Sequence, residues 1–283
     1  MAFTFSDLLQ AVYAELGQLQ TGTISSGSTT TVIDGEISGW HKDGDWKNGA
    51  IFIIDVGGAA PEGEFSRISG YDDSAGQFDL ATALSAAVSV GDNYGFVSAY
   101  YSLGTMIELV NAGLRTLGDI ALVNTTTLDS SAGQSEYTAT VNWKRRRPMA
   151  IDYQGQPGVS GNNQWVRVYD WEYVPSLPGE DGLIIFNEEL PAGRDVRIWY
   201  VDRHPRLSQF DDVVSETIAL ELAVAAGVER ALRYQNSRLA GSEPFLVQRW
   251  NDAKVELARA QVSFPVWTPR RVANLMQVRA GSV

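Results

Sequence analysis

Residues 211–236 read DDVVSETIALELAVAAGVERALRYQN, and this stretch is the strongest indication of fold in the chain. Apolar residues lie on most sides of the helix that it predicts, from Val213 through Leu222 to Leu232. A helix that is apolar on most sides has to be buried, either inside its own domain or against a partner. The stretch therefore predicts one long helix that another part of the chain or a partner must cover.

Three other segments also predict helices. Residues 4–19 and residues 103–120 each carry one stripe of apolar side chains at helical spacing. A further helix is expected to begin after Ser242, with Pro244 tolerated in its first turn. Its apolar residues recur at alternating spacings of four and three, which is typical of a seam against one neighbour. The seam consists of Leu246, Trp250, Ala253, Leu257, Ala260 and Phe264.

Residues 30–100, between the first two helices, carry the signals of short strands. Compact apolar or alternating runs are separated there by turns rich in Gly and Asp. Several short strands at this spacing indicate a small all-β barrel or sandwich. The expected strands are Ala50–Val56, Phe65–Ile68, Gln77–Leu80 and Tyr94–Ala99.

A second β region is expected at about residues 124–201. Residues 164–174 alternate, which predicts one strand with an aromatic face. Leu183–Phe186 and Asp195–Val201 predict further strands, so two or three hairpins packed on helices would satisfy the pattern. We interpret the aromatic face as core, with a platform that stacks bases or sugars as the alternative. This face consists of Trp165, Arg167, Tyr169, Trp171 and Tyr173.

Composition and charge exclude several classes of protein. The chain has no cysteine, so disulfides, thiol nucleophiles and thiolate metal sites are excluded. The formal net charge is -12, and most of it comes from the acid-rich residues 1–103, where phosphates of wrapped DNA would be repelled. The first twenty residues lack the pattern of a signal peptide, and the most apolar segment, Ile218–Val228, is too short to cross a membrane. We therefore expect a soluble, non-secreted protein.

The search for catalytic or metal-binding patterns returns no convincing site. His41 and His204 both fall in predicted loops, where isolated histidines are usually simple surface residues. Asp43–Gly49 resembles a calcium loop, but Lys47 stands where the third oxygen ligand belongs, so a tight polar turn is the favoured interpretation. The sequence predicts no catalytic residue, no cofactor and no bound metal.

Two basic segments are candidate partner interfaces. Lys144, Arg145, Arg146 and Arg147 form one dense run, which would line a DNA conduit or pair with an acidic patch of an adjacent subunit; a solvated strand edge is the equal alternative. The other segment, residues 265–283, contains basic residues and no acid, so it is suited to an acidic protein surface, either on a neighbouring copy or on another protein that the chain binds. The candidate residues in it are Arg270 and Arg271.

Several motifs occur in an order that resembles a small β module of phage virion proteins. They are a Thr-rich opening at residues 23–34, the turn Asp45–Ala50, the strand motif Arg67–Tyr71 and the late Gly91–Tyr94. The surrounding layout, in which helices are interrupted by β insertions, resembles head-to-tail adaptor (neck or connector) proteins of tailed bacteriophages.

The resemblance implies an α+β fold, in which a helical adaptor-type bundle carries a small all-β barrel or sandwich insertion and a second β-hairpin region. Residues 1–20 and 103–264 would form the helical core with its β-hairpins, residues 21–102 the inserted all-β module, and residues 265–283 an extended C-terminal arm.

The resemblance also implies a function. The expected protein is a non-enzymatic virion subunit at the head-tail junction, made in the host cytoplasm. It would form a homo-oligomeric ring, typically a dodecamer, that binds the portal protein and the next neck or tail protein and lets genomic DNA pass without sequence specificity or contact with a membrane.

Two other functions fit parts of the sequence. The first is a tail-fibre, baseplate or capsid-decorating protein that uses the β module to bind receptors or glycans; the long helices predicted after residue 211 argue against it, because fibre proteins are usually rich in β-structure to their ends. The second is a hydrolase of cell-wall polymer with Asp43 and Asp45 as its acid–base pair.

Overall fold

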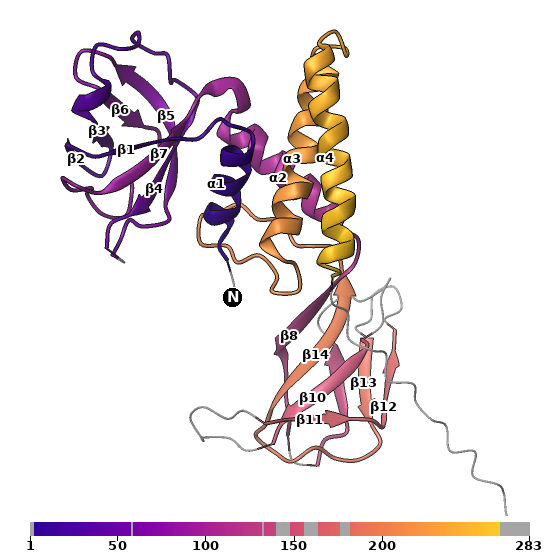
Figure 1. The fold of residues 1–283 in the computed structure, drawn as a ribbon. Helices are drawn as coiled ribbons and strands as arrows, with labels where there is room; N and C mark the ends of the chain where they lie inside the picture. The colour runs from indigo at the N-terminus through magenta and orange to yellow at the C-terminus, as the bar shows by residue number, and fades with distance from the viewer. Residues whose placement is uncertain are drawn as a thin grey trace, which may run out of the picture. The chain divides into compact units, whose positions relative to one another are not determined.

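The computed structural model describes residues 3–57, 59–131, 133–139, 148–155, 164–175 and 182–266. These residues divide into two compact units, each with its own core. The first unit contains residues 3–118 and 204–266, and the second contains residues 119–203 (Figure 1). The second unit is thus inserted between two segments of the first.

The first unit contains a seven-stranded antiparallel sheet with the strand order β1-β7-β4-β5-β6-β3-β2. Two short 3-10 helices, Gly35–Ile37 and Ala99–Tyr101, flank its strands. The strands are β1 (Gln20–Thr23), β2 (Ser26–Gly27), β3 (Thr31–Ile33), β4 (Ala50–Asp55), β5 (Phe65–Asp72), β6 (Gln77–Leu80) and β7 (Asn93–Val97).

This sheet closes into a barrel because its two end strands belong to one run of chain. β1 pairs with β7, and β2, only two residues further on, pairs with β3. Between them, the amide of Ile24 donates to Asp92 O (2.8 Å) and the amide of Ser25 donates to Ile33 O (2.8 Å). Of the two expected arrangements, a small all-β barrel or a sandwich, the strands therefore form the barrel.

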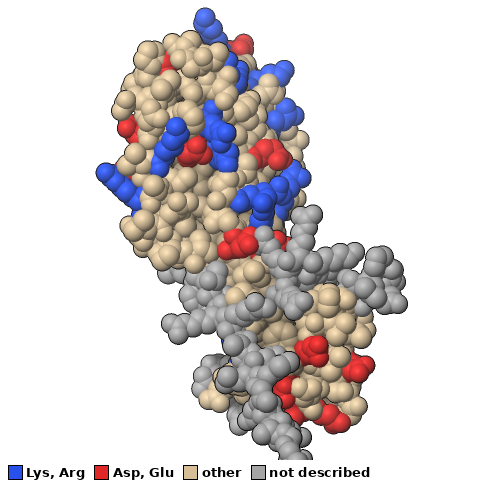
Figure 2. Space-filling model, turned by 90° about the vertical axis from the view of Figure 1, so that its right-hand side faces the viewer, with Lys and Arg blue, Asp and Glu red and all other residues tan. Residues whose placement is uncertain are grey.

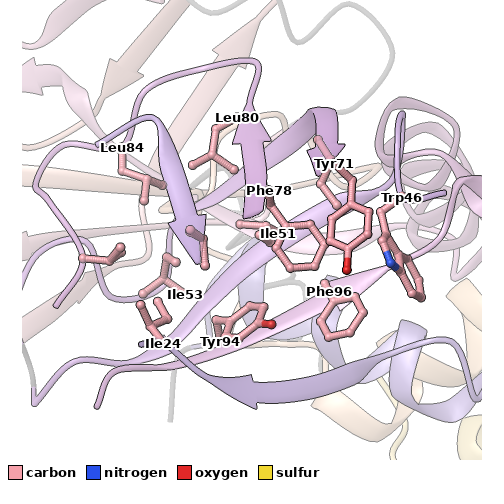
Figure 3. Packing of buried hydrophobic residues seen from close by; sticks show 13 residues of the cluster. Ile24, Trp46, Ile51, Ile53, Tyr71, Phe78, Leu80, Leu84, Tyr94 and Phe96 are labelled. Atoms are coloured by element: carbon pink, nitrogen blue, oxygen red, sulfur yellow. The ribbon is translucent and has the colours of Figure 1, made fainter. Parts of the chain in front are cut away.

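The barrel core is aromatic at one end and aliphatic at the other (Figure 3). Phe78 packs against Tyr71 and Phe96, with ring centroids 5.0 and 5.2 Å away. Ile24, Ile53 and Leu84 fill the opposite end. Because these side chains come from strands far apart in sequence, the core fixes how the strands pair.

Four helices complete the first unit: α1 (Phe5–Glu15), α2 (Leu103–Thr116), α3 (Leu220–Arg238) and α4 (Pro244–Ser263). Thr4 caps α1 through a capping box with Asp7. α3 lies at the centre and contacts each of the other three helices. The buried face of α1 also packs on the barrel, where the Tyr13 and Phe52 rings meet edge to face.

The helix predicted for residues 211–236 is wrong in its first part, because α3 begins only at Leu220. Val213 instead forms an isolated bridge with Thr4, and the amide of Val214 donates to Phe3 O (3.1 Å). The β-branched residues of this segment thus pair with the chain that enters α1. The β-branched side chains favour extended backbone in this segment, and the pairing with Thr4 stabilises that conformation.

Close approach between helices depends on two glycines. A Cβ on Gly113 of α2 would lie 2.7 Å from Ala226 O, and one on Gly227 of α3 would lie 2.8 Å from a methyl group of Val12. α2 and α1 therefore pack on α3 at a distance that any larger side chain would increase.

The second unit consists of two antiparallel sheets. β8 (Ile120–Asp129), β10 (Ala150–Gln154), β11 (Trp165–Val168) and β14 (Asp195–Asp202) form a four-stranded sheet in the order β11-β10-β14-β8. β9 (Glu136–Ala139), β12 (Trp171–Val174) and β13 (Gly182–Phe186) form a three-stranded sheet in the order β12-β13-β9. One hydrophobic cluster takes residues from both sheets, among them Ile151, Ile198, Ile184 and Phe186.

The single strand predicted for residues 164–174 is wrong. β11 and β12 are two strands that belong to different sheets, and the chain passes between the sheets at Tyr169 and Asp170. Trp171 and Tyr173 are buried in the core, whereas Tyr169 is 67% exposed. The alternation of side chains in residues 164–174 continues where the chain passes from one sheet to the other. For this reason the sequence resembles a single strand.

The predicted fold class also has to be corrected. The described residues hold three antiparallel sheets of seven, four and three strands and four α-helices, so the protein is mostly β and is not a helical adaptor-type bundle. Within the described residues, no helix combines the length and the apolar character that a membrane span needs.

Candidate protein–protein interface

A groove runs along the helices of the first unit, between α1 and α4 and over α3. Its volume is about 880 Å³, and residues of all three helices line it. α1 contributes small side chains, α3 the floor and α4 the longer wall. The lining consists of Ala11, Ala14, Glu15, Leu220, Glu221, Val224, Ala225, Val228, Leu232, Arg249, Asp252, Ala253, Glu256, Arg259, Ala260, Ser263 and Phe264.

The floor of the groove is the outer face of α3. The opposite face of α3 is buried, with Ala223 and Ala226 fully shielded from solvent. Val224 and Ala225 remain half-exposed on the groove side. The helix is thus apolar on more sides than its own domain covers, as expected for a helix with a second partner.

The rim of the groove is charged, with acids in excess. Glu15, Glu221, Asp252 and Glu256 face two bases, Arg249 and Arg259. Arg259 Nη1 lies 2.6 Å from Glu256 Oε1 in an exposed ion pair, which contributes little stability. The rim therefore presents a net negative charge beside an apolar floor.

A contact between α3 and α4 holds the wall of the groove in place. Trp250 Nε1 donates a hydrogen bond of 3.0 Å to Oε1 of the buried Glu229. Lys254 Nζ lies 3.3 Å from the centroid of the Trp250 ring, at cation–π distance. These contacts hold α4 on α3 whether or not another molecule is bound in the groove.

The predicted seam on α4 packs partly on α3, while three of its residues, Ala253, Ala260 and Phe264, also line the groove. Leu246 and Ala253 are buried there. Large apolar side chains remain exposed elsewhere on this part of the chain, including Phe245, Val262 and Phe264, the last of which lines one end of the groove. Figure 2 shows Lys and Arg interspersed with Asp and Glu on one face of the helices.

A polar cluster lies on the four-stranded sheet of the second unit. The buried carboxylate of Asp152 accepts hydrogen bonds from Arg167 Nε, from Arg197 Nε (2.8 Å) and from Trp199 Nε1 (2.8 Å). The Arg197 guanidinium also lies 4.4 Å from the Trp165 ring centroid. Each group has its partner inside the cluster, so the arrangement clamps three strands together rather than presenting a site.

The two histidines differ from each other. His204 is buried, so its prediction as a surface residue is wrong. The amide of Ser215 donates to Nε2 (3.1 Å), and Nδ1 lies 2.7 Å from Pro205 O, so the neutral ring with its proton on Nδ1 links two parts of the loop. Burial lowers the pKa of His204 and favours this neutral form. His41 is half-buried and meets the Trp46 ring edge to face at 5.1 Å.

The carboxylates of the predicted polar turn bind backbone amides. Asp45 Oδ2 accepts from the amide of Lys42 (2.9 Å), and Asp43 Oδ1 accepts from the amide of Asp73 (2.9 Å). Both side chains thus hold loops of the barrel. Across the described parts of the chain, no three His, Asp or Glu residues are grouped so that they could hold a metal ion.

The predicted interface residues Lys144, Arg145, Arg146, Arg147, Arg270 and Arg271 all lie outside the described residues. Sequence reasoning missed the groove, although it identified α3 as a helix in need of a partner. Ala11 and Ala14 were a usable signal, since two small residues on one face of a helix leave room for another chain.

Comparisons of the chain with protein-family models, with curated proteins and with solved structures find no match.

Proposed function

We propose that this chain is a non-enzymatic structural subunit of a tailed-bacteriophage virion, a head-to-tail adaptor that forms a ring with its own copies at the head-tail junction. The groove between α1, α3 and α4 is the observation that carries the proposal. An apolar floor with a charged rim, built on fixed helices, is typical of a surface that binds another polypeptide.

The groove suits repeated assembly because it offers a concave surface to a segment of another copy. When such a site binds a different part of the next copy, the contact is head-to-tail, and it generates a closed ring if the rotation between copies closes. The proposed partners are further copies of the chain, the portal protein, the next neck or tail protein and the passing genomic DNA. The described helices need not form a bundle for this role, because α3 and its groove alone supply the contact.

One observation favours a second candidate, a tail-fibre, baseplate or capsid-decorating protein. The described residues form three antiparallel sheets, an architecture common in proteins that bind receptors or glycans. Such a protein would assemble without the portal, and its subunit number would differ from that of a neck ring.

Native mass spectrometry of the purified chain, alone and mixed with the portal protein, tests the proposal. A ring of identical copies, formed alone or only on the portal, is the expected result. A protein that stays monomeric in both samples would contradict the proposal, and a trimer that ignores the portal would favour the fibre or decoration role.

A further inference from the structure

We infer that the groove between α1, α3 and α4 is the docking site for residues 267–283 of a second copy of this chain. The inference rests on the proposed function. That function requires neighbouring subunits to be joined, and the inference names the segment that joins them. Four features support it: the charges of the two surfaces, the apolar side chains of the segment, the dimensions of the groove and the direction in which the chain leaves α4.

The charges of the two surfaces are complementary. Residues 267–283 contain Arg270, Arg271 and Arg279 and no Asp or Glu. The groove rim carries four carboxylates, from Glu15 on α1 to Glu256 on α4, against two arginines. Exposed charges of opposite sign steer association and set the orientation of the bound segment, while adding little affinity.

The apolar side chains of the segment match the floor. Trp267, Val272, Leu275 and Met276 are large enough to cover the half-exposed Val224 and its small neighbours. Burial of such side chains contributes most of the affinity at protein interfaces. Phe264, which is 40% exposed at one end of the groove, would be covered by the same contact.

The dimensions of the groove fit this segment. The lining of α4 extends from Arg249 to Phe264, which corresponds to about 22 Å at the rise of an α-helix. Residues 267–283 would span roughly 25 Å as a helix and roughly 55 Å fully extended. The segment is therefore long enough to fill the groove in either conformation.

The direction of the chain favours a second copy over the chain's own groove. α4 ends at Ser263, a bend follows at Phe264, and residues 265 and 266 lie in no hydrogen-bonded turn. The segment thus begins at the end of its own groove without having reversed. Docking into the next copy requires no reversal and produces the head-to-tail contact that closes a ring.

The absence of cysteine in this chain allows a direct test by disulfide cross-linking. One protein carries Val224→Cys in the groove, and another, with a tag that changes its mass, carries Leu275→Cys. We expect the mixed proteins to form a covalent dimer of one chain of each kind under mild oxidation. A matched control replaces Val224→Cys with Val166→Cys on the exposed face of β11 and should form no such dimer.

A charge variant adds a quantitative measurement. Replacing both Arg270 and Arg271 by Glu should lower the yield of the cross-linked dimer about fivefold, which corresponds to about 1 kcal/mol. Added salt should lower the yield of the unaltered segment but raise that of the variant, because salt screens an attraction in the first case and a repulsion in the second.

The outcomes separate this inference from the proposed function. The double variant Val224→Cys/Leu275→Cys would link within one chain if the segment filled its own groove, and this result, with no dimer in the mixture, would overturn the inference. Oligomers by native mass spectrometry without any cross-link would also overturn it while leaving the proposed function intact. A monomer in every sample would contradict both.

Discussion

The barrel of the first unit and the two-sheet core of the second unit hold their strands together in different ways. The barrel joins its end strands through the chain segment at Ile24 and Ser25, and its interior is a continuous set of aromatic and aliphatic side chains. In the second unit the sheets remain separate, and a buried carboxylate, Asp152, ties three strands of one sheet together. The barrel depends mainly on apolar packing, and its buried carboxylates, Asp34 and Glu64, accept from neutral donors. In the second unit the buried carboxylate is paired with two arginines.

The largest expected effect comes from truncating the barrel core. Phe78→Ala removes a fully buried ring that contacts three other aromatic rings, and it should lower the free energy of unfolding by about 3–5 kcal/mol. Phe186→Ala is the matched change in the second unit, where the ring is also buried. Denaturant unfolding followed by a probe in each unit should show that each variant weakens mainly its own unit. If both probes reported the same loss of unfolding free energy for both variants, the two units would unfold as one.

Asp152→Ala should have the next largest effect. It removes the shared partner of Arg167 and Arg197, but these arginines are partly exposed, so water compensates for some of the loss. We expect the second unit to lose about 2 kcal/mol of unfolding free energy and the barrel to be unaffected. Asp195→Ala, at the exposed start of β14, is the control and should change stability by less than about 0.5 kcal/mol. A loss no larger than that of the control would show that the clamp adds nothing to stability.

The smallest effect is a dependence on pH in the first unit. The folded state lowers the pKa of His204 below its ordinary value, so the unfolded chain binds the proton more readily. The neutral ring contributes fully to the stability of the folded first unit above the ordinary pKa of about 6.5. This contribution is lost as the pH falls through the lowered pKa. Unfolding of the first unit should become easier between pH 7.5 and pH 5, and His204→Gln should reduce this slope. An unchanged slope would assign the pH dependence to other groups.

Local patterns in the sequence predicted much of the fold. β6 occupies the expected residues 77–80, and α2 begins at the expected Leu103. Each of these elements has a period or a turn signal inside its own few residues, so no distant contact is needed to define it. The small barrel followed from the spacing of such strands.

Features that depend on distant contacts were not predicted. The passage of the chain between sheets at Tyr169 leaves no mark in the alternation of residues 164–174. The bridge of Val213 to Thr4 joins two segments that are far apart in the sequence. The groove was missed for the same reason, because its alanines and carboxylates are ordinary residues of three separate helices. The wrong fold class came from the resemblance in layout to adaptor proteins, because helices interrupted by β-segments can also belong to a mostly β protein.

Replacement of Val224 by Glu tests the central claim, that the α1–α3–α4 groove is the assembly surface, most directly. Val224 is half-exposed on the floor of the groove, so the variant should fold, which circular dichroism would verify. Native mass spectrometry, with and without the portal protein, should then show a ring for the unaltered chain and for the control Val166→Glu, but no ring for Val224→Glu. A ring of unchanged mass formed by Val224→Glu would contradict the claim.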